Sequence, residues 1–287
     1  MMAIFKRELK SYFNGMIGFL FVAFLLAFTG VFVTSYNLIG GYTAFEYALE
    51  STAIVFLLSV PILTMRSIAD DKRLKTDKLL YSLPIKLSQV VMGKYLAMLA
   101  VLLIPTVILA AYPLILSSFG TVNLTASYAC LFGFFLLGAA LIAICMFLSS
   151  LAESQIVAAI LGFAAVFMVY IAESVSTMIP ETALVSLLCL VAIAALIGLV
   201  SYFLTKHTPL AFTVGGALAG VVLIVFLINS SLFVGLVPAI LSKLALFNHF
   251  SIFSYGLLDI PALILYISVS VFFVMLTVLG AEKKRWA

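Results

Sequence analysis

The stretch MRSIADDKRLKTDKLLYSLPIKLSQVVMGK, residues 65–94, interrupts an otherwise strongly apolar chain. It holds ten charged side chains, whereas the whole sequence has only 15 Lys or Arg and 11 Asp or Glu residues. Apolar runs long enough to cross a bilayer flank it on both sides. A highly charged loop between two membrane helices predicts a docking surface for a soluble partner.

The composition of the chain indicates its class. Hydrophobic residues make up 66% of the sequence, charged residues make up 9%, and the mean hydropathy is +1.33. Soluble globular proteins have about 45–50% apolar and about 25% charged residues. The sequence therefore predicts an all-α polytopic membrane protein. Helices are expected because lipid offers the backbone no hydrogen-bond partner, and the apolar runs are continuous rather than alternating.

The apolar runs predict about eight transmembrane helices. A helix needs about 20 mostly apolar residues to cross the hydrocarbon core. The runs that meet this condition are 16–36, 47–65, 95–117, 126–149, 155–174, 184–204, 210–230 and 260–281. The short connection Thr205–Pro209 is the weakest boundary, since another arrangement of 184–230 would change the count by two.

The distribution of Lys and Arg predicts the orientation of these spans. With both termini in the cytoplasm, 14 of the 15 basic residues lie on the cytoplasmic side, and Lys243 is the exception. Such a bias follows the positive-inside rule. The outer segments instead carry acidic residues, which are Glu46, Glu50, Glu173, Glu181 and Asp259.

Residues 1–14 predict an interfacial helix that leads into the first span. The basic side chains of Lys6, Arg7 and Lys10 can meet anionic lipid headgroups, while apolar side chains between Ile4 and Phe13 share another face. This helix either anchors the chain or transmits motion. A signal peptide fits less well, because the apolar run is too long and no small-residue cleavage site follows it.

The predicted spans carry no charged side chain at their centres. Glu50 and Glu173 fall near outer ends, and Glu153 opens the fifth span at its inner end. Ionisable residues retained in mid-membrane usually mark ion or proton paths. The pattern therefore argues against an ion-coupled transporter or a proton pump, although sodium sites built from carbonyl groups stay open.

Motifs of enzymatic chemistry are missing from the sequence, which has no H-E-x-x-H, G-x-S-x-G or Gly-rich phosphate loop. His207 and His249 fall on opposite sides of the predicted membrane and cannot share a metal. Cys130, Cys145 and Cys189 lie in apolar runs without C-x-x-C spacing, which favours buried thiols. We therefore expect no cofactor and no metal on this chain, and any ATP must be bound by another chain.

Within the charged loop, Ser67–Leu80 predicts a short amphipathic helix. Asp70 and Asp71 stand near its start and Lys75 and Lys78 near its end, an order that suits the helix dipole. A loop that only anchored the chain would need a few basic residues and no more. The mixture of signs around a helical core favours a docking surface over passive anchoring.

Four patches carry a resemblance to a known family. LTMRSIADDKRLKTDKLLYSLPIKLSQVVMGKYLA (63–97) contains a Met-Arg pair, an acidic-basic cluster, Thr, two leucines, a Pro-containing turn and Gly-Lys. The others are FLSSLAESQIVAAILGF (147–163), FNHFSIFSYGLLDI (247–260) and AEKKRWA (281–287). This pattern resembles ABC-2-type permeases, and most closely the subgroup grouped with gliding-motility and copper-enzyme-maturation ABC systems. The order of apolar and charged segments resembles that of the family over most of the chain. The patches 63–97 and 247–260 are the most specific ones.

The resemblance implies a permease domain over 15–287 with a cytoplasmic coupling loop at 66–94. Such permeases pair with a second permease chain, as a homodimer or heterodimer, and dock separate ATPase subunits that bind ATP and Mg. The coupling residues implied on this sequence are Arg66, Asp70, Asp71, Lys72, Arg73, Lys75, Thr76 and Glu153. The usual core of the family has six spans, so two of the eight are additional, and segments 184–230 could line the path or lie outside it.

The outer segment 231–259 is too irregular for a simple span and predicts one or two short helices at, or dipping into, the outer leaflet. Phe247, Phe250, Phe253 and Tyr255 form an aromatic set within it. These rings either pack the segment together or form an outer gate.

The sequence leaves three hypotheses for the function of the protein. The first is the permease subunit of an ATP-driven exporter in the plasma membrane of a bacterial or archaeal cell, with the lipid bilayer and no nucleic acid among its partners. The second is an ion-coupled secondary transporter or channel that works without an ATPase, and the third is a membrane enzyme or assembly scaffold. The nearly uncharged spans favour an amphipathic, lipid-like, peptide or drug substrate over a highly charged one.

Overall fold

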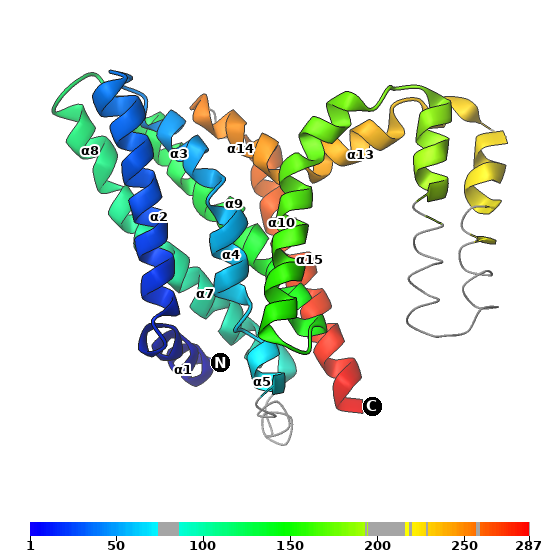
Figure 1. The fold of residues 1–287 in the computed structure, drawn as a ribbon, viewed down its shortest axis with the longest axis horizontal. Coiled ribbons are helices and arrows are strands. Elements are labelled where there is room, and N and C mark those ends of the chain that lie inside the picture. The colour runs from blue at the N-terminus through cyan, green and yellow to red at the C-terminus, as the bar shows by residue number, and fades with distance from the viewer. Residues whose placement is uncertain are drawn as a thin grey trace. The chain divides into compact units, whose positions relative to one another are not determined.

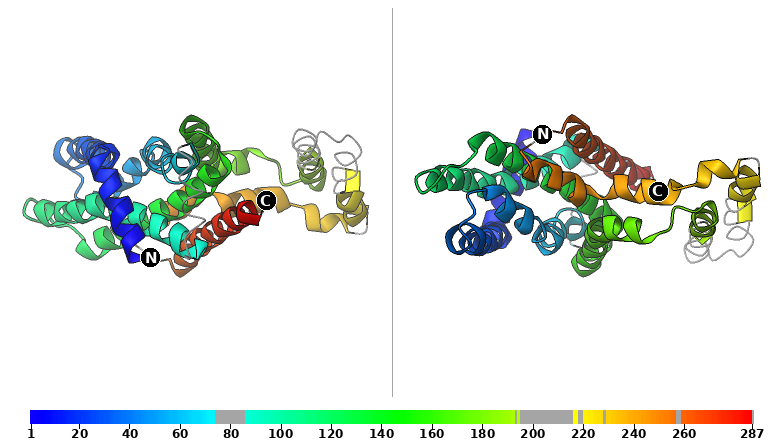
Figure 2. Two further views of the ribbon diagram at one scale, coloured as in Figure 1. Left: turned by 90° about the horizontal axis from the view of Figure 1, so that it is seen from below. Right: turned by 90° about the horizontal axis from the view of Figure 1, so that it is seen from above.

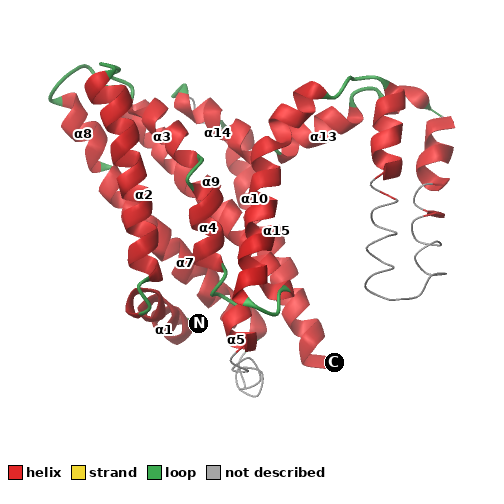
Figure 3. Ribbon diagram, in the orientation of Figure 1, coloured by secondary structure: helices red, strands yellow, loops and turns green. Residues whose placement is uncertain are grey.

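The computed structural model describes residues 1–73, 86–192, 194, 216–217, 220–227, 229–256 and 259–286, with the side chains of 283–286 left undescribed. These residues form helices joined by turns, and no strand occurs among them (Figure 3). The chain divides into two compact units. The first unit comprises Met1–Tyr170 and Leu246–Ala287, and the second comprises Ile171–Ala245.

The first unit is a helical bundle (Figure 1). Its elements in chain order are α1 (Met2–Asn14), α2 (Ile17–Val33), the π-helix η1 (Thr34–Ile39), α3 (Phe45–Ala53), α4 (Phe56–Thr64), α5 (Ala69–Arg73), α7 (Leu87–Leu109), α8 (Ala111–Ser117), α9 (Leu124–Leu151), α10 (Gln155–Met178, which runs on into the second unit), α14 (Leu246–Ser254) and α15 (Ile260–Trp286). The second unit adds the helix Ala183–Ala192, the helix Gly220–Leu227, the 3-10 helix η2 (Ser230–Phe233) and α13 (Leu236–Leu244).

Within the described residues, five helices are long and apolar enough to cross a membrane, and the number rises to seven if each of two bent helix pairs is one span. The five are Ile17–Ile39, Leu87–Ser117, Leu124–Leu151, Gln155–Met178 and Ile260–Glu282. They overlap the predicted spans 16–36, 95–117, 126–149, 155–174 and 260–281. Much of 184–204 and 210–230 lies outside the described residues, so a total of eight stays a prediction.

The predicted span 47–65 is a broken helix rather than a straight one. Its first half, α3, meets the segment Phe56–Arg73, which contains α4 and α5, at an angle of 54°. At the break the backbone bonds tighten to the 3-10 pattern, with Val55 N donating to Thr52 O and Leu57 N donating to Ile54 O. The sequence shows only a continuous apolar run here, so the bend was not predicted.

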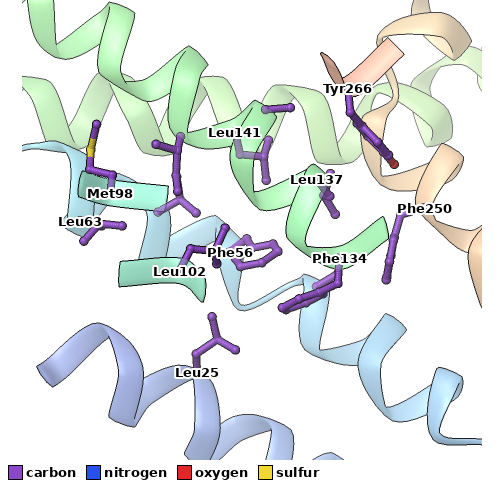
Figure 4. Close-up of a cluster of buried hydrophobic side chains, with 14 of the residues drawn as sticks. Leu25, Phe56, Leu63, Met98, Leu102, Phe134, Leu137, Leu141, Phe250 and Tyr266 are labelled. Carbon is purple, nitrogen blue, oxygen red and sulfur yellow. The ribbon is translucent and has the colours of Figure 1, made fainter. Parts of the chain in front are cut away.

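Helix α9 is the centre of the bundle. It packs against α3, α4, α7, α14 and α15. In its most apolar stretch of 18 residues, 72% of the residues are buried in the protein. Its glycines let neighbours approach closely: a Cβ added at Gly138 would lie 2.7 Å from Leu102 Cδ2 and 3.1 Å from Phe56 Cζ. Small residues of this kind are how membrane helices pack tightly without a hydrophobic driving force. Figure 4 shows Phe56, Leu102 and Phe134 gathered at this crossing.

Helix α1 lies across the ends of the long helices rather than parallel to them, as the left view of Figure 2 shows. It crosses α7 at Gly93, where an added Cβ would lie 3.1 Å from Ile4 Cγ2. Tyr12 and Ile4 are buried, and Phe5 and Leu9 pack against the core. The apolar face of α1 is therefore covered by the protein, and its exposed face carries Lys6, Arg7 and Lys10.

Candidate functional site

A cluster of charged side chains joins α1, α5 and α7 at one end of the first unit, and α5 also contacts the end of α9. Figure 1 shows α1, α5 and the carboxyl end of α15 at this end. We call this cluster the charged junction, and its members are Glu8, Arg66, Asp70, Asp71, Lys72, Arg73 and Lys94.

Lys94 is the central residue of the charged junction. It lies about two turns inside α7, because that helix begins at Leu87, before the predicted membrane span 95–117. Its side chain is only 5% exposed, and its Nζ lies 2.7 Å from Asp71 Oδ2 and 3.2 Å from Glu8 Oε1. Nζ also donates to Ser67 O at 2.7 Å. An ammonium group has three N–H donors, and here they face three acceptors.

Lys72 ties α5 to the end of α9. Its Nζ donates to Ser150 O, and to Ala152 O at 3.0 Å. These are carbonyls of the last turn and the C-cap of α9, where the negative end of the helix dipole favours a cation. The ammonium of Lys72 therefore caps α9 from the charged loop.

Ser149 makes a second bond between the same two elements. Its Oγ accepts from Ala69 N at 3.2 Å and from Ile68 N at 3.4 Å, so it satisfies backbone donors at the start of α5. Beneath this contact, Ala69 packs with Ala152 in a small buried cluster. The amino end of α5 is thus seated on the turn between α9 and α10.

The two arginines of the charged junction are more exposed. Arg66 Nε lies 3.4 Å from Asp70 Oδ2, and Arg73 Nη2 lies 3.1 Å from Asp70 Oδ1. Arg73 has 57% of its side chain exposed, and ion pairs of this kind contribute only about 0–1 kcal/mol to folding. The Arg66 guanidinium occupies the space over Gly15, where an added Cβ would meet it at 2.5 Å.

The predicted coupling residues therefore separate by exposure. Asp71 and Lys72 are partly buried and hold the helix in place, whereas Arg73 and Glu153 are exposed. Lys75, Thr76 and the rest of the helix predicted over Ser67–Leu80 extend beyond the described residues. Of that helix, the structure has α5 over Ala69–Arg73.

The two ion pairs of Lys94, with Glu8 and with Asp71, were not predicted from the sequence, because they join segments that are far apart along the chain. Lys94 was counted only as one more cytoplasmic cation, and Glu8 was not singled out at all. A Lys at the core-facing register of an apolar helix is the signal that could have pointed to Lys94.

Tyr12 of α1 is buried near Glu8. Burial raises the pKa of the Tyr12 hydroxyl, and the Glu8 carboxylate adds to that shift, so the hydroxyl stays neutral.

The three basic residues predicted to anchor α1 are exposed together. Lys6, Arg7 and Lys10 stand on the uncovered face of the helix. Arg7 Nη2 lies 2.9 Å from Glu8 Oε1, and this hydrogen bond raises the pKa of Arg7. Contact of these side chains with lipid headgroups stays a prediction.

The aromatic residues of the predicted outer gate do not form one cluster. Phe250 and Phe253 are buried in the core, and Phe253 fills the space over Gly133. Phe247 is half-buried, and its ring meets that of Tyr170 edge to face, with centroids 5.3 Å apart. Tyr255 is 75% exposed. The short helices α13 and α14 occupy this segment, and their depth in a membrane stays a prediction.

The described residues contain no group of three or more His, Cys, Asp or Glu that could hold a metal ion. Cys130 and Cys145 are buried free thiols, and Cys189 is partly exposed. A buried acidic residue does occur in α3, where Glu46 Oε1 accepts a 2.7 Å hydrogen bond from Ser127 Oγ. This pair links α3 to α9 and was not predicted.

Comparison with known families places these features in context. A family model described as ABC-2 family transporter protein matches residues 2–184. The match runs from α1 to α10 and so includes every residue of the charged junction. Comparisons with curated proteins and with solved structures found no match. Since the matched residues are more than half of a chain that has several membrane-length apolar helices, this protein belongs to the ABC-2 family of transporter proteins.

Proposed function

We propose that this chain is the permease subunit of an ATP-driven exporter, and that a separate ATPase subunit docks on the charged junction. Membership of the ABC-2 family supports a transport component that is not itself catalytic. ATP and Mg would be bound by the partner, with a second permease chain completing the assembly. The subgroup of gliding-motility and copper-enzyme-maturation systems is the relative that the four sequence patches favour.

The observation that carries this proposal is the attachment of α5. A five-residue helix has too few backbone hydrogen bonds to be stable by itself. Here it is held to α7 and α1 through the ion pairs of Lys94 and to α9 through Lys72 and Ser149. A push on the exposed side of α5 would therefore reach three other helices at once.

Transmission of this kind needs elements that move as units between two arrangements. Helix α9 is suited to this role because it contacts α5 at one end and α3 and α14 along its length. We infer that closure of the ATPase subunits shifts α5, and that α7 and α9 carry the shift across the membrane to the path for the substrate.

The proposal includes a topology of eight spans, with both termini and the charged junction in the cytoplasm. The excess of Lys and Arg on one predicted side supports this orientation. A plasma-membrane location in a bacterial or archaeal cell, and an amphipathic, lipid-like, peptide or drug substrate, complete the hypothesis.

The first experiment is to purify the tagged full chain from its native membrane in mild detergent and to identify co-purifying proteins by mass spectrometry. We expect a stoichiometric protein with Walker motifs, and ATPase activity in the purified complex. A chain that purifies alone even after crosslinking would overturn the proposal and favour the ion-coupled transporter or channel.

A surface variant makes this experiment specific for the charged junction. Arg73→Glu reverses an exposed charge on α5, and Lys243→Glu makes the same change on the exposed Lys of α13. We expect Arg73→Glu to reduce recovery of the ATPase subunit at least tenfold, while Lys243→Glu recovers it as the wild type does. Equal recovery with both variants would show that docking lies elsewhere.

A further inference from the structure

Two cavities of about 390 and 420 Å³ lie in the first unit, and both are lined by Glu50 and Ser51 of α3. Both take lining residues from α3, and Figure 1 shows α3 at the end of the first unit away from α5. The remaining lining is almost entirely aromatic or apolar: Phe32, Ala53, Ile54, Tyr170, Phe247 and Phe250 in one cavity, and Tyr36, Tyr42 and Tyr47 in the other.

The aromatic rings of these cavities hold one another in place. Tyr42 and Tyr47 meet edge to face with centroids 6.1 Å apart, and Phe32 stacks on Tyr36 at 6.5 Å. Aromatic pairs of this geometry are favourable in themselves. Four of the lining rings are therefore paired with one another in the structure.

Among the residues that the structure describes, Glu50 is the only charged one that lines either cavity. In the described part of the chain it forms no ion pair with a Lys, Arg or His side chain. Its neighbour on the same helix, Glu46, is buried and bonded to Ser127, so Glu46 has a structural partner and Glu50 does not share it. A half-buried carboxylate among aromatic rings is costly unless something positive approaches it.

We propose that Glu50 and the surrounding rings bind a bulky organic cation, such as a quaternary ammonium or phosphonium group with apolar substituents. The faces of Tyr and Phe rings attract such cations, and a carboxylate adds direct charge attraction. A mainly aromatic and apolar lining with a few polar groups is also the usual make-up of a small-molecule site. A small inorganic cation fits less well, because hard divalent cations favour several carboxylate or carbonyl ligands, whereas the lining oxygens other than those of Glu50 belong to Tyr and Ser hydroxyls.

The bound organic cation could come from two sources. One is a soluble lipophilic cation, and the other is the choline headgroup of a membrane lipid. Tyrosines also gather at membrane interfaces without any ligand. That placement alone gives no role to the carboxylate of Glu50, so substitution of Glu50 separates a binding site from an ordinary interfacial belt.

The test is equilibrium binding of radiolabelled tetraphenylphosphonium to the full chain in nanodiscs of phosphatidylethanolamine and phosphatidylglycerol. Empty nanodiscs measure partitioning into lipid, and tetraphenylborate provides a probe of the same shape and opposite charge. We expect saturable binding of the cation and none of the anion. The experiment needs no ATPase, so its result is independent of the proposed coupling.

Variants of the lining decide whether binding occurs at Glu50. Glu50→Gln keeps the size of the side chain and should weaken binding roughly tenfold, as expected for a partly solvated charge pair. Glu282→Gln alters an exposed acid near the carboxyl end of α15 and should bind as the wild type does. Tyr47→Phe should keep most of the affinity, whereas Tyr47→Leu should lose several-fold, because only the first keeps an aromatic face.

The proposal would be overturned if the wild type and Glu50→Gln bound tetraphenylphosphonium with equal affinity. This comparison requires that size-exclusion chromatography shows both proteins to be folded. Equal binding of tetraphenylborate would also overturn the proposal. If phosphatidylcholine in the nanodisc competes with the probe in the wild type and not in Glu50→Gln, the site is supported and the lipid headgroup is its occupant. If it does not compete, the site is supported for a soluble cation.

Discussion

At the scale of single residues, the charged junction depends on Lys94. Its ammonium group is buried between two carboxylates and a backbone carbonyl. Removing one partner of a buried ion pair is costly mainly because the other charges are left without compensation. Lys94 is therefore expected to matter more for stability than the exposed Arg73, although both belong to the same cluster.

The first prediction concerns Lys94→Met, which keeps the length of the side chain and removes its charge. We expect a loss of about 3–5 kcal/mol in the free energy of unfolding, because the carboxylates of Asp71 and Glu8 would lose the buried ammonium group that both of them contact. Thermal unfolding of the purified chain in detergent measures the change. The double variant Lys94→Met with Asp71→Asn should recover part of the loss, and purely additive effects would contradict the pairing of Lys94 with Asp71.

The second prediction concerns Ser149→Ala, which removes the acceptor at the start of α5. We expect a cost of about 1 kcal/mol and faster hydrogen exchange of the peptide that contains Ile68 and Ala69. Ser118→Ala changes an exposed serine at the C-cap of α8 and serves as the control. Unchanged exchange at Ala69 in Ser149→Ala would show that the hydroxyl does not hold α5.

These residue roles could be predicted only in part from the sequence. The local order of Asp70, Asp71, Lys72 and Arg73 suits a short helix, and α5 is found there. The attachment of that helix depends on side chains far away along the chain, such as Glu8 and Ser149. Hydropathy and local charge order carry no information about such pairs, because they are created by the packing of distant helices.

At the scale of elements, the close packing around α9 determines how the bundle is held together. Gly138 sits where α4 and α7 approach α9, and there is no room for a side chain. The apolar runs predicted most of the helix positions, because a membrane span needs a minimum length. They did not predict the bend between α3 and α4, since a broken apolar helix has the same hydropathy as a straight one.

The third prediction compares two glycines in membrane-length helices. Gly138→Ala would place a methyl group 2.7 Å from Leu102 Cδ2, whereas nothing lies within 4 Å of a Cβ added at Gly30. We expect Gly138→Ala to destabilise the chain by about 1–3 kcal/mol through overpacking. Gly30→Ala should be neutral or slightly stabilising, because alanine favours the helix.

Thermal unfolding in detergent checks this pair, and both variants add the same methyl group. A lower unfolding temperature for Gly30→Ala than for Gly138→Ala would contradict the packing of α9 described above.

At the scale of the whole molecule, orientation in the membrane links the two proposed sites. Figure 1 shows α5, which carries part of the charged junction, and α3, which carries Glu50, at opposite ends of the first unit. With the junction in the cytoplasm, the cavities at Glu50 would open on the outer side. An organic cation bound there would then be positioned for release from the cell or for contact with the outer leaflet.

The fourth prediction tests this orientation with single cysteines introduced into a variant that lacks Cys130, Cys145 and Cys189. Tyr42→Cys should react with a membrane-impermeant maleimide in intact cells, because Tyr42 is exposed near the cavities. Glu153→Cys should react only after the membrane is permeabilised. The reverse pattern would contradict the proposed topology.

The central claim is that the charged junction couples an ATPase partner to the membrane helices. The most direct measurement is the ATPase rate of the complex in nanodiscs, relative to the isolated ATPase subunit, for the wild type, Lys94→Met and Lys243→Met. We predict that Lys94→Met still captures the ATPase subunit but loses most of the change in rate that the wild-type permease causes. Lys243→Met should behave as the wild type does. A folded Lys94→Met complex with the wild-type rate would contradict the claim.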